Sequence, residues 1–431
     1  MRSLLTAALL ALPPLALAQG SLTPTGAPAA SMKSLDQIEA RTPIGAVDGS
    51  SGTLTIKRSG SYVLLGNVAV TAGPAIAIST SNVTLDLNGF TLSSTDATAA
   101  SDAITVNELS DAITIRNGHI MGGGTIDENG NFVPGPGFAS GLYAPNSSAF
   151  LLENITVTGV GQAGLFLAAS HSANTIRHCA VTRCGGDGLA ADVVVDSSAI
   201  EVYSGIRALQ VANCRAECHG SGSGIEAGNI TNSTGISVEG SGISGETVTN
   251  CVGDSNEDHG IAATTVIGSR GLSGKRCGIL ATTVTDCDGS SRTGPGISAT
   301  HTSNSQGSSD SDTGLLSYTA INSSGNSGSG TGLHAFNDAY LPGRPGTAEN
   351  CGGISDSGDG LIATIAMNCV GTTNAGNKHG ILVEGTANSC RGTNTDPTGG
   401  AAIKAAIAVA CTAAVGRIDV TTPNGKQLGT P

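Results

Sequence analysis

Aromatic and charged side chains are scarce in this chain of 431 residues. Tryptophan is absent, aromatic residues make up 3% and charged residues only 12%, whereas 39% of the residues are hydrophobic. A disordered acidic chain would be rich in charge and poor in apolar residues, so this composition excludes that class. The formal net charge of −13 also argues against nucleic acid and anionic membranes as partners, because both repel an acidic protein.

Long apolar runs are missing as well. The one run, residues 4–17, is too short to span a bilayer and contains two prolines, so we expect no membrane span. Arg2 precedes this run and Ala16-Leu17-Ala18 ends it, a pattern that is typical of a secretory signal peptide cleaved near Ala18. The sequence therefore predicts a mature chain that is secreted or held at the cell surface.

Glycine, in contrast, is abundant, with 63 residues, and it marks an internal repeat. A Gly followed by Ile or Leu recurs every eighteen residues from Gly224 to Gly332. The same pair stands at Gly188, Gly205 and Gly360. Eight residues after such a Gly stands a corner residue, usually Asn, which Cys or Ser usually follows; after Gly332 an insertion delays it to Asn350. These corner residues are Asp196, Asn213, Asn232, Asn250, Gly268, Asp286, Asn304, Asn322, Asn350 and Asn368, with less regular counterparts at Asn67, Asn88, Asn117, Asn154 and His178.

The repeat predicts a stacked β-solenoid. Stretches such as residues 297–300 alternate apolar and polar side chains, so each can turn one face inward. Gly permits corners with positive φ or close packing, and Asn at a corner can bond to neighbouring coils and stack into a ladder. Because a stack lengthens without separate cores, we expect one solenoid domain.

The domain prediction has five segments. They are a signal peptide at 1–18, a Pro- and Ala-rich linker at 19–31, an N-terminal cap at 32–53, a single solenoid at 54–420 and a tail at 421–431.

Two N-terminal segments carry a family resemblance. Residues 81–94 (SNVTLDLNGFTLSS) and 111–123 (DAITIRNGHIMGG) alternate apolar and polar residues and contain Asn-Gly. They resemble the opening coils of right-handed parallel β-helix proteins, the pectin-lyase-like superfamily, and the resemblance extends over about residues 54–420. It implies an all-β, right-handed parallel β-helix with short coils of about eighteen residues in the C-terminal half. It leaves the function open, because that superfamily includes lyases, hydrolases, epimerases, adhesins and tailspikes.

Two rival solenoids share an eighteen-residue coil. A left-handed hexapeptide helix needs an aliphatic residue every six positions, but the sixth and twelfth residues after Ile279 are Thr285 and Ser291. A calcium β-roll needs Gly-Gly-x-Gly-x-Asp nonapeptides, which do not recur here. The pattern therefore favours the right-handed helix.

Eleven cysteines in an exported chain suggest disulfides, but the repeat constrains them. Cys179, Cys214, Cys251 and Cys287 fall in alternate coils, roughly 9–10 Å apart at the usual strand spacing. Because a disulfide needs Cα atoms within about 7 Å, we interpret these four as core filling. Pairs in adjacent coils stay open, namely Cys351 with Cys369 and Cys390 with Cys411, as does Cys184 with Cys218.

Candidate functional residues fall in three groups. Arg116, Glu153 and Arg177 precede successive corner residues, so we expect a surface column that is either structural or able to bind sugar carboxylates. Residues 171–219 are the part of the chain richest in titratable groups, and His171, Arg177, Arg183 and Asp187 are its candidate catalytic residues. Tyr203 and Arg207 are candidate substrate-binding residues there, and Tyr340 and Arg344 are candidates in the insertion 336–349.

Three histidines, His219, His259 and His379, each precede a Gly, and we interpret them as exposed corner residues. The motifs of polygalacturonases and of the best-known pectate lyases are absent, so no catalytic residue follows from the resemblance. Our first hypothesis is therefore a secreted β-helix protein that binds polysaccharide or a cell-surface glycan. The alternatives are a lyase or hydrolase of acidic polysaccharide and a structural or adhesive rod. Calcium binding is compatible with the acidic composition but is not required by it.

Overall fold

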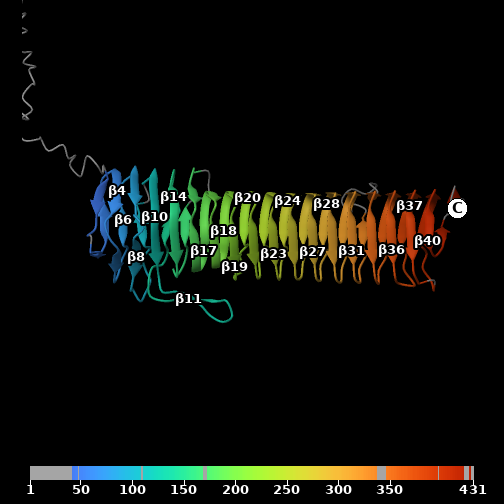
Figure 1. Cartoon of the computed structure of the whole chain (residues 1–431), viewed down its shortest axis with the longest axis horizontal. Helices are drawn as coiled ribbons and strands as arrows, with labels where there is room; N and C mark the ends of the chain where they lie inside the picture. Colours follow the sequence, from blue (N-terminus) through green and yellow to red (C-terminus); the bar gives the residue numbers. More distant parts are fainter. Residues whose placement is uncertain are drawn as a thin grey trace, which may run out of the picture. The chain divides into compact units, whose positions relative to one another are not determined.

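The structure is a computed structural model, and it describes residues 41–46, 48–107, 110–167, 172–336, 346–396, 398–421 and 427–428. Within these residues every regular element is a β-strand, and no helix is present that could cross a membrane. Residues 42–431 form one compact unit, in which successive coils stack along one axis (Figure 1). The predicted signal peptide, the linker and residues 32–40 of the predicted cap lie outside the described residues.

The first coils contain nine strands. They are β1 (Thr42–Ile44), β2 (Ser50–Ser51), β3 (Leu54–Ile56), β4 (Gly60–Leu64), β5 (Val68–Val70), β6 (Ile76–Ile78), β7 (Val83–Asp86), β8 (Thr91–Ser94) and β9 (Ile104–Val106). β1 pairs with β4 and β2 pairs with β5. β1 and β2 thus pair with strands of the next coil, although both fall in the segment 32–53 that the sequence assigned to the cap.

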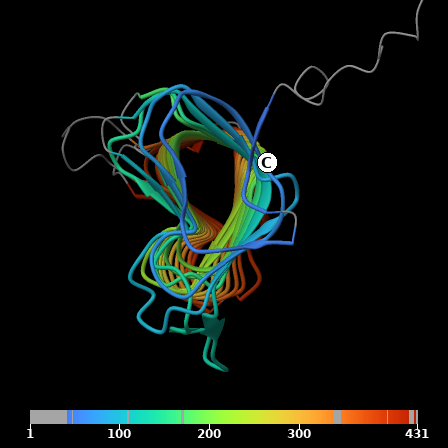
Figure 2. The same ribbon diagram turned by 90° about the vertical axis from the view of Figure 1, so that its left-hand side faces the viewer.

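The middle coils are longer and less regular. Their strands are β10 (Ile113–Met121), β11 (Thr125–Ile126), β12 (Phe132–Val133), β13 (Leu142–Ala144), β14 (Leu151–Thr158), β15 (Leu165–Leu167), β16 (Thr175–Arg177), β17 (Ala180–Val195), β18 (Ser198–Ala212) and β19 (Arg215–Cys218). β11 and β12 form an antiparallel hairpin, which projects from the stack when it is viewed along its axis (Figure 2).

The remaining coils follow the eighteen-residue repeat. Their strands are β20 (Ile225–Thr231), β21 (Thr234–Ser237), β22 (Ile243–Thr249), β23 (Val252–Ser255), β24 (Ile261–Ile267), β25 (Arg270–Ser273), β26 (Ile279–Thr285), β27 (Asp288–Ser291), β28 (Ile297–Ser303), β29 (Gln306–Ser309), β30 (Leu315–Ile321), β31 (Ser324–Ser327), β32 (Leu333–Ala335), β33 (Thr347–Glu349), β34 (Gly352–Ser355), β35 (Leu361–Met367), β36 (Val370–Thr373), β37 (Ile381–Asn388), β38 (Arg391–Asn394), β39 (Ile403–Val409), β40 (Thr412–Val415), β41 (Ile418–Val420) and β42 (Gln427–Leu428).

Strands of successive coils pair in parallel and in register. Ile279 of β26 lies beside Ile297 of β28, which lies beside Leu315 of β30, and all three side chains are fully buried. Alternate residues point outward, so the core is a column of aliphatic side chains along the stack axis. The predicted all-β parallel solenoid is confirmed.

The corner residues have the backbone conformation that the repeat requires. Positive φ values of 49–59° occur at Asn88, Asn117, Asn154, His178, Asp196, Asn213, Asn232, Asn250, Gly268, Asp286, Asn304, Asn322, Asn350, Asn368, Ser389 and Ala410. Asn tolerates this left-handed region better than most residues. Amides of adjacent corners also contact one another, since Asn322 Nδ2 donates to Asn304 Oδ1 at 3.2 Å.

The Gly of each Gly-Ile or Gly-Leu pair is required by close packing. A Cβ on Gly296 would lie 2.3 Å from the backbone nitrogen of Ser308 and 2.6 Å from the carbonyl oxygen of Gly314. Its φ is not in the positive range, so space rather than backbone freedom selects Gly here. At the position of Gly296 the coil leaves no space for a side chain.

Candidate functional site

The predicted Arg116–Glu153–Arg177 column exists, with a fourth member. Arg116 of β10 lies beside Glu153 of β14, and Glu153 lies beside Arg177 of β16. Arg177 Nη2 is 3.0 Å from Glu153 Oε1, whereas Arg116 Nε is 3.3 Å from Oδ2 of the buried Asp86. Each guanidinium is thus balanced by a carboxylate, so the column offers no excess positive charge to a sugar carboxylate.

Sequence reasoning missed Asp86 because this residue does not directly precede its corner residue. Arg116 directly precedes the corner residue Asn117, but Leu87 separates Asp86 from the corner residue Asn88. Asp86 nevertheless lies beside Arg116. Its Oδ1 also accepts hydrogen bonds from the backbone of Asn88 at 2.9 Å and from Nδ2 of Asn117 at 3.1 Å.

The predicted catalytic residues are not joined into one group by any described contact. His171 lies outside the described residues. Arg177 is held by Glu153, and Arg183 Nη2 donates to Thr158 Oγ1 at 3.2 Å. Asp187 is instead paired with Arg207. The structure therefore gives these residues three separate sets of partners.

Tyr203, Tyr340 and Arg344 complete the predicted set. The exposed side chain of Tyr203 shares a 2.9 Å hydrogen bond with Ser221 Oγ. Tyr340 and Arg344 lie outside the described residues. In the described ranges, no group of three or more His, Cys, Asp or Glu side chains is suited to a metal ion, so calcium binding gains no support.

An aromatic pair lies on the outer face of the sheet in the middle coils. Tyr143 of β13 lies directly beside Phe166 of β15, and the rings stack with centroids 4.7 Å apart and an interplanar angle of 29°. Their strand neighbours, such as Leu142 and Leu165, are buried, so strand alternation turns both rings outward. Tyr143 is 46% exposed and presents a free apolar surface.

Arg207 extends this aromatic surface. In register, Phe166 is followed by Ala190 of β17 and then by Arg207 of β18. Ala190 is only 1% exposed although its position faces outward, because longer side chains on either side cover it. The guanidinium lies 5.8 Å above the centre of the Phe166 ring and pairs with the carboxylate of Asp187. We call Tyr143, Phe166, Arg207 and Asp187 the platform.

A recess adjoins the platform. It has a volume of about 190 Å³ and is lined by Val106, Asn107, Ser110, Tyr143, Ala144, Pro145, Asn146, Ser147 and Phe150. Polar amide and hydroxyl groups therefore surround one edge of the exposed Tyr143 ring. An apolar ring face bordered by hydrogen-bonding groups and a guanidinium suits a ligand that has an apolar face and hydroxyl groups at its edge.

The platform follows from a pattern that extends further upstream than the strict repeat. Gly141-Leu142-Tyr143, Gly164-Leu165-Phe166 and Gly205-Ile206-Arg207 share the Gly-Ile or Gly-Leu motif. The residue after each aliphatic residue points outward, so the three side chains fall in one column. Sequence reasoning identified Arg207 and Asp187 but missed the two aromatic residues, because it counted the motif only from Gly188 onward.

Comparisons with known proteins agree on the fold. Residues 49–228 match the family model described as the right handed beta helix region, which is less than half of the chain. Together with the parallel register of the whole stack, this match defines a right-handed parallel β-helix, as predicted. The comparison with curated proteins found no match.

Two solved structures show distant similarity. The Dettilon tailspike protein is 11% identical, with a TM-score of 0.28, and the aligned region covers 89% of this chain but only 62% of the tailspike chain. The A-module of the mannuronan C-5 epimerase AlgE6 from Azotobacter vinelandii is also 11% identical, with a TM-score of 0.25 and coverage of 86% and 90%, respectively. Neither similarity is close enough to carry a function to this chain.

Proposed function

We propose that this chain is an exported β-helix protein that binds polysaccharide at the platform. The observation that carries the proposal is the stacked Tyr143–Phe166 pair, extended by Arg207 on the outer face of the stack. Aromatic faces pack against the apolar face of a flat ring, and the neighbouring polar groups can bond to its hydroxyls. The signal-like residues 1–18 support export.

The charges favour a neutral polysaccharide over an acidic one. Arg207 is already paired with Asp187, and the whole chain carries a formal charge of −13. A polyuronate would meet repulsion over most of the surface without an unpaired guanidinium on the platform. We therefore infer that stacking and hydroxyl contacts, rather than ion pairing, hold the ligand.

Binding is tested by retention of the mature chain, residues 19–431, on immobilised polysaccharides. The panel includes neutral β-glucan, xylan and galactomannan beside acidic pectate and alginate. We expect retention on at least one neutral polymer and its loss in Phe166→Ala and Tyr143→Ala. Tyr318→Ala is the matched control, because this partly exposed ring lies on β30 and contacts His301 instead of the platform. Equal retention of all three variants would contradict the proposal.

The same polysaccharides also test whether the protein is catalytic. No described contact brings the candidate catalytic residues together, so we expect neither unsaturated uronate products, followed by absorbance, nor new reducing ends. Product formation from pectate or alginate would support the lyase or hydrolase alternative. Absence of both retention and products would leave a structural or adhesive rod as the remaining hypothesis.

A further inference from the structure

A second recess lies beneath the projecting hairpin, apart from the platform. The hairpin β11–β12 leaves the stack after β10 and returns before β13, and it projects from the coils in Figure 2. Phe132 of this hairpin packs against two glycines: a Cβ on Gly185 would lie 2.9 Å from its ring, and a Cβ on Gly124 would lie 2.4 Å from it. The hairpin is thus seated on coils that lie more than fifty residues further along the chain.

This hairpin recess has a volume of about 160 Å³. It is lined by Ile126, Gly130, Asn131, Phe132, Cys184, Glu201, Val202, Tyr203, His219, Gly220 and Glu239. Pockets for drug-sized ligands typically measure about 300–1,000 Å³. The hairpin recess therefore suits one small group or a single ring, and it is too small for a longer segment of polymer.

The two carboxylates of the hairpin recess are accompanied by one ionisable base, His219. The lining of the recess includes the carboxylates of Glu201 and Glu239 but neither Lys nor Arg. Elsewhere in the described residues, several carboxylates are paired with a guanidinium or an ammonium group, among them Asp187, Glu217 and Glu257. Neither recess carboxylate has such a partner in the described part of the chain.

Backbone geometry places Glu201 at the hairpin recess. The pairing of β18 with β19 shifts register between Ile200 and Val202, so Glu201 is an extra residue without a partner in the next coil. Its φ is 57°, a left-handed conformation that is uncommon for Glu. Such strain is retained only where surrounding contacts enforce it, and Glu201 lines the hairpin recess together with two aromatic residues, Phe132 and Tyr203.

We propose that the hairpin recess binds a ligand carrying an ammonium group, of the class of amino sugars with a free amine. The Glu201 and Glu239 carboxylates accept charge-assisted hydrogen bonds from the ammonium group. The faces of Phe132 and Tyr203 favour a cation through their ring quadrupoles. Glu201 and Glu239 would repel a sugar carboxylate, and no group of three or more His, Cys, Asp or Glu side chains in the described residues could hold a metal ion.

The inference is tested by calorimetric titration of the mature chain with glucosamine, N-acetylglucosamine and glucuronate. We expect only glucosamine to bind, because acetylation removes the positive charge. Glu239→Gln keeps the size of the side chain but removes its charge, so we expect binding to weaken by about tenfold or more. Glu226→Gln is the matched control, since Glu226 is exposed on β20 beside Arg207 and lies outside the hairpin recess.

A second variant tests the aromatic wall of the recess separately from its carboxylates. Phe132→Ala removes one aromatic wall without changing any carboxylate, and we expect it to weaken glucosamine binding while thermal unfolding shows that the stack is folded. Equal binding of glucosamine and N-acetylglucosamine, or binding that is unchanged in Glu239→Gln, would overturn the inference. So would terbium or calcium binding that Glu239→Gln abolishes. Polysaccharide retention in Glu239→Gln tests the platform separately, because that variant leaves the platform intact.

Discussion

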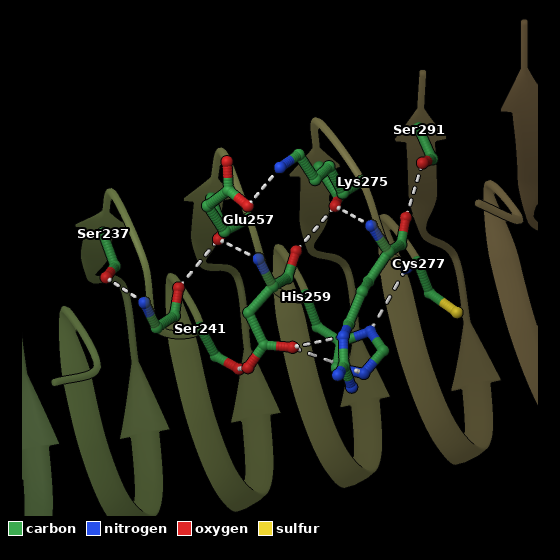
Figure 3. Close-up of polar contacts among 12 residues, drawn as sticks. Ser237, Ser241, Glu257, His259, Lys275, Cys277 and Ser291 are labelled. Carbon is green, nitrogen blue, oxygen red and sulfur yellow. Dashed lines mark hydrogen bonds and ion pairs between the residues drawn. The ribbon is translucent and has the colours of Figure 1, made fainter. Parts of the chain in front are cut away.

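At the scale of single residues, a column of buried serines joins the corners of successive coils. Each serine donates from Oγ to a carbonyl of the preceding coil and accepts a backbone N–H three residues further on. Ser255 donates to Gly240 at 2.7 Å and accepts from Asp258 at 2.9 Å. Figure 3 shows parts of the same pattern at Ser237 and Ser291. Sequence reasoning missed this column although Ser stands five residues after most corner residues.

We predict that Ser255→Ala destabilises the protein by about 1–3 kcal/mol, because it leaves the part-buried N–H of Asp258 and the buried carbonyl of Gly240 without this partner. Chemical denaturation followed by circular dichroism measures the change. Ser298→Ala is the control, because Ser298 faces outward from β28 and we expect a change within about 0.5 kcal/mol. Equal effects of the two substitutions would show that the column adds no stability.

The prediction that three histidines are exposed corner residues is wrong. His219, His259 and His379 are partly buried rather than exposed, and the His259 side chain is only 13% exposed. Nδ1 of His259 accepts the backbone N–H of Cys277 at 3.2 Å (Figure 3), and Nδ1 of His379 accepts that of Ala401 at 2.9 Å. These two rings link adjacent coils, a role that requires the neutral imidazole.

Because these rings accept hydrogen bonds only in the neutral form, we predict that the protein loses stability in mild acid. Burial lowers the pKa of His259, His334 and His379 below the ordinary value of 6.5. Below pH 6.5 the unfolded chain therefore binds protons that the folded chain does not yet bind, so the free energy of unfolding falls as the pH decreases toward the folded pKa values. Melting temperatures between pH 7.5 and 5 measure this, and His259→Gln, which keeps an acceptor but cannot titrate, should reduce the slope. A slope that is unchanged in this variant would exclude His259 as a contributor.

At the scale of elements, the regular corners were predictable and the irregular ones were not. From Asn232 to Asn322 the corners are eighteen residues apart and all have positive φ, so the spacing alone located them. Asn67 does not have positive φ; its Oδ1 instead accepts the N–H of Thr91 at 2.9 Å. Extra residues such as Leu87 and Glu201 shift the register locally. The candidate site was therefore predicted only in part, because it lies where the coils vary in length.

Cys and Ser occupy the same position of the repeat, directly after the corner residue. All eleven cysteines are buried and free, and none of the three disulfides left open by the sequence is formed. Cys251 and Ser269 follow successive corner residues, and the N–H of Cys251 donates to Ser269 Oγ at 3.0 Å. Burial raises the pKa of Cys179 and of Cys184 to about 12, so these thiols stay protonated and unreactive at neutral pH.

We predict that a thiol reagent such as dithionitrobenzoate modifies almost no cysteine in the native protein and all eleven after denaturation. Burial prevents attack in the native state, and the absence of disulfides leaves every thiol available once the stack unfolds. Spectrophotometric titration in buffer and in guanidinium chloride gives both numbers. A shortfall of two or four thiols after denaturation would instead indicate disulfides, for which Cys351–Cys369 and Cys390–Cys411 are the candidates.

At the scale of the whole molecule, most residues of the candidate binding surfaces lie in the coils that depart from the eighteen-residue repeat. The platform consists of Tyr143, Phe166, Asp187 and Arg207, and the residues that line the hairpin recess fall between Ile126 and Glu239 in the sequence. Longer coils supply loops and hairpins that can surround a ligand, whereas a minimal coil exposes mostly small polar side chains. The regular C-terminal half contributes length and stability to the stack.

The most direct test of this account is calorimetric titration of the mature protein with an oligosaccharide of the polymer that retains it best. Removing one ring of the stacked pair should weaken binding by about tenfold, so we predict this loss for Phe166→Ala and wild-type affinity for Tyr318→Ala. Equal affinities of Phe166→Ala and the wild type would show that the platform is not the binding site.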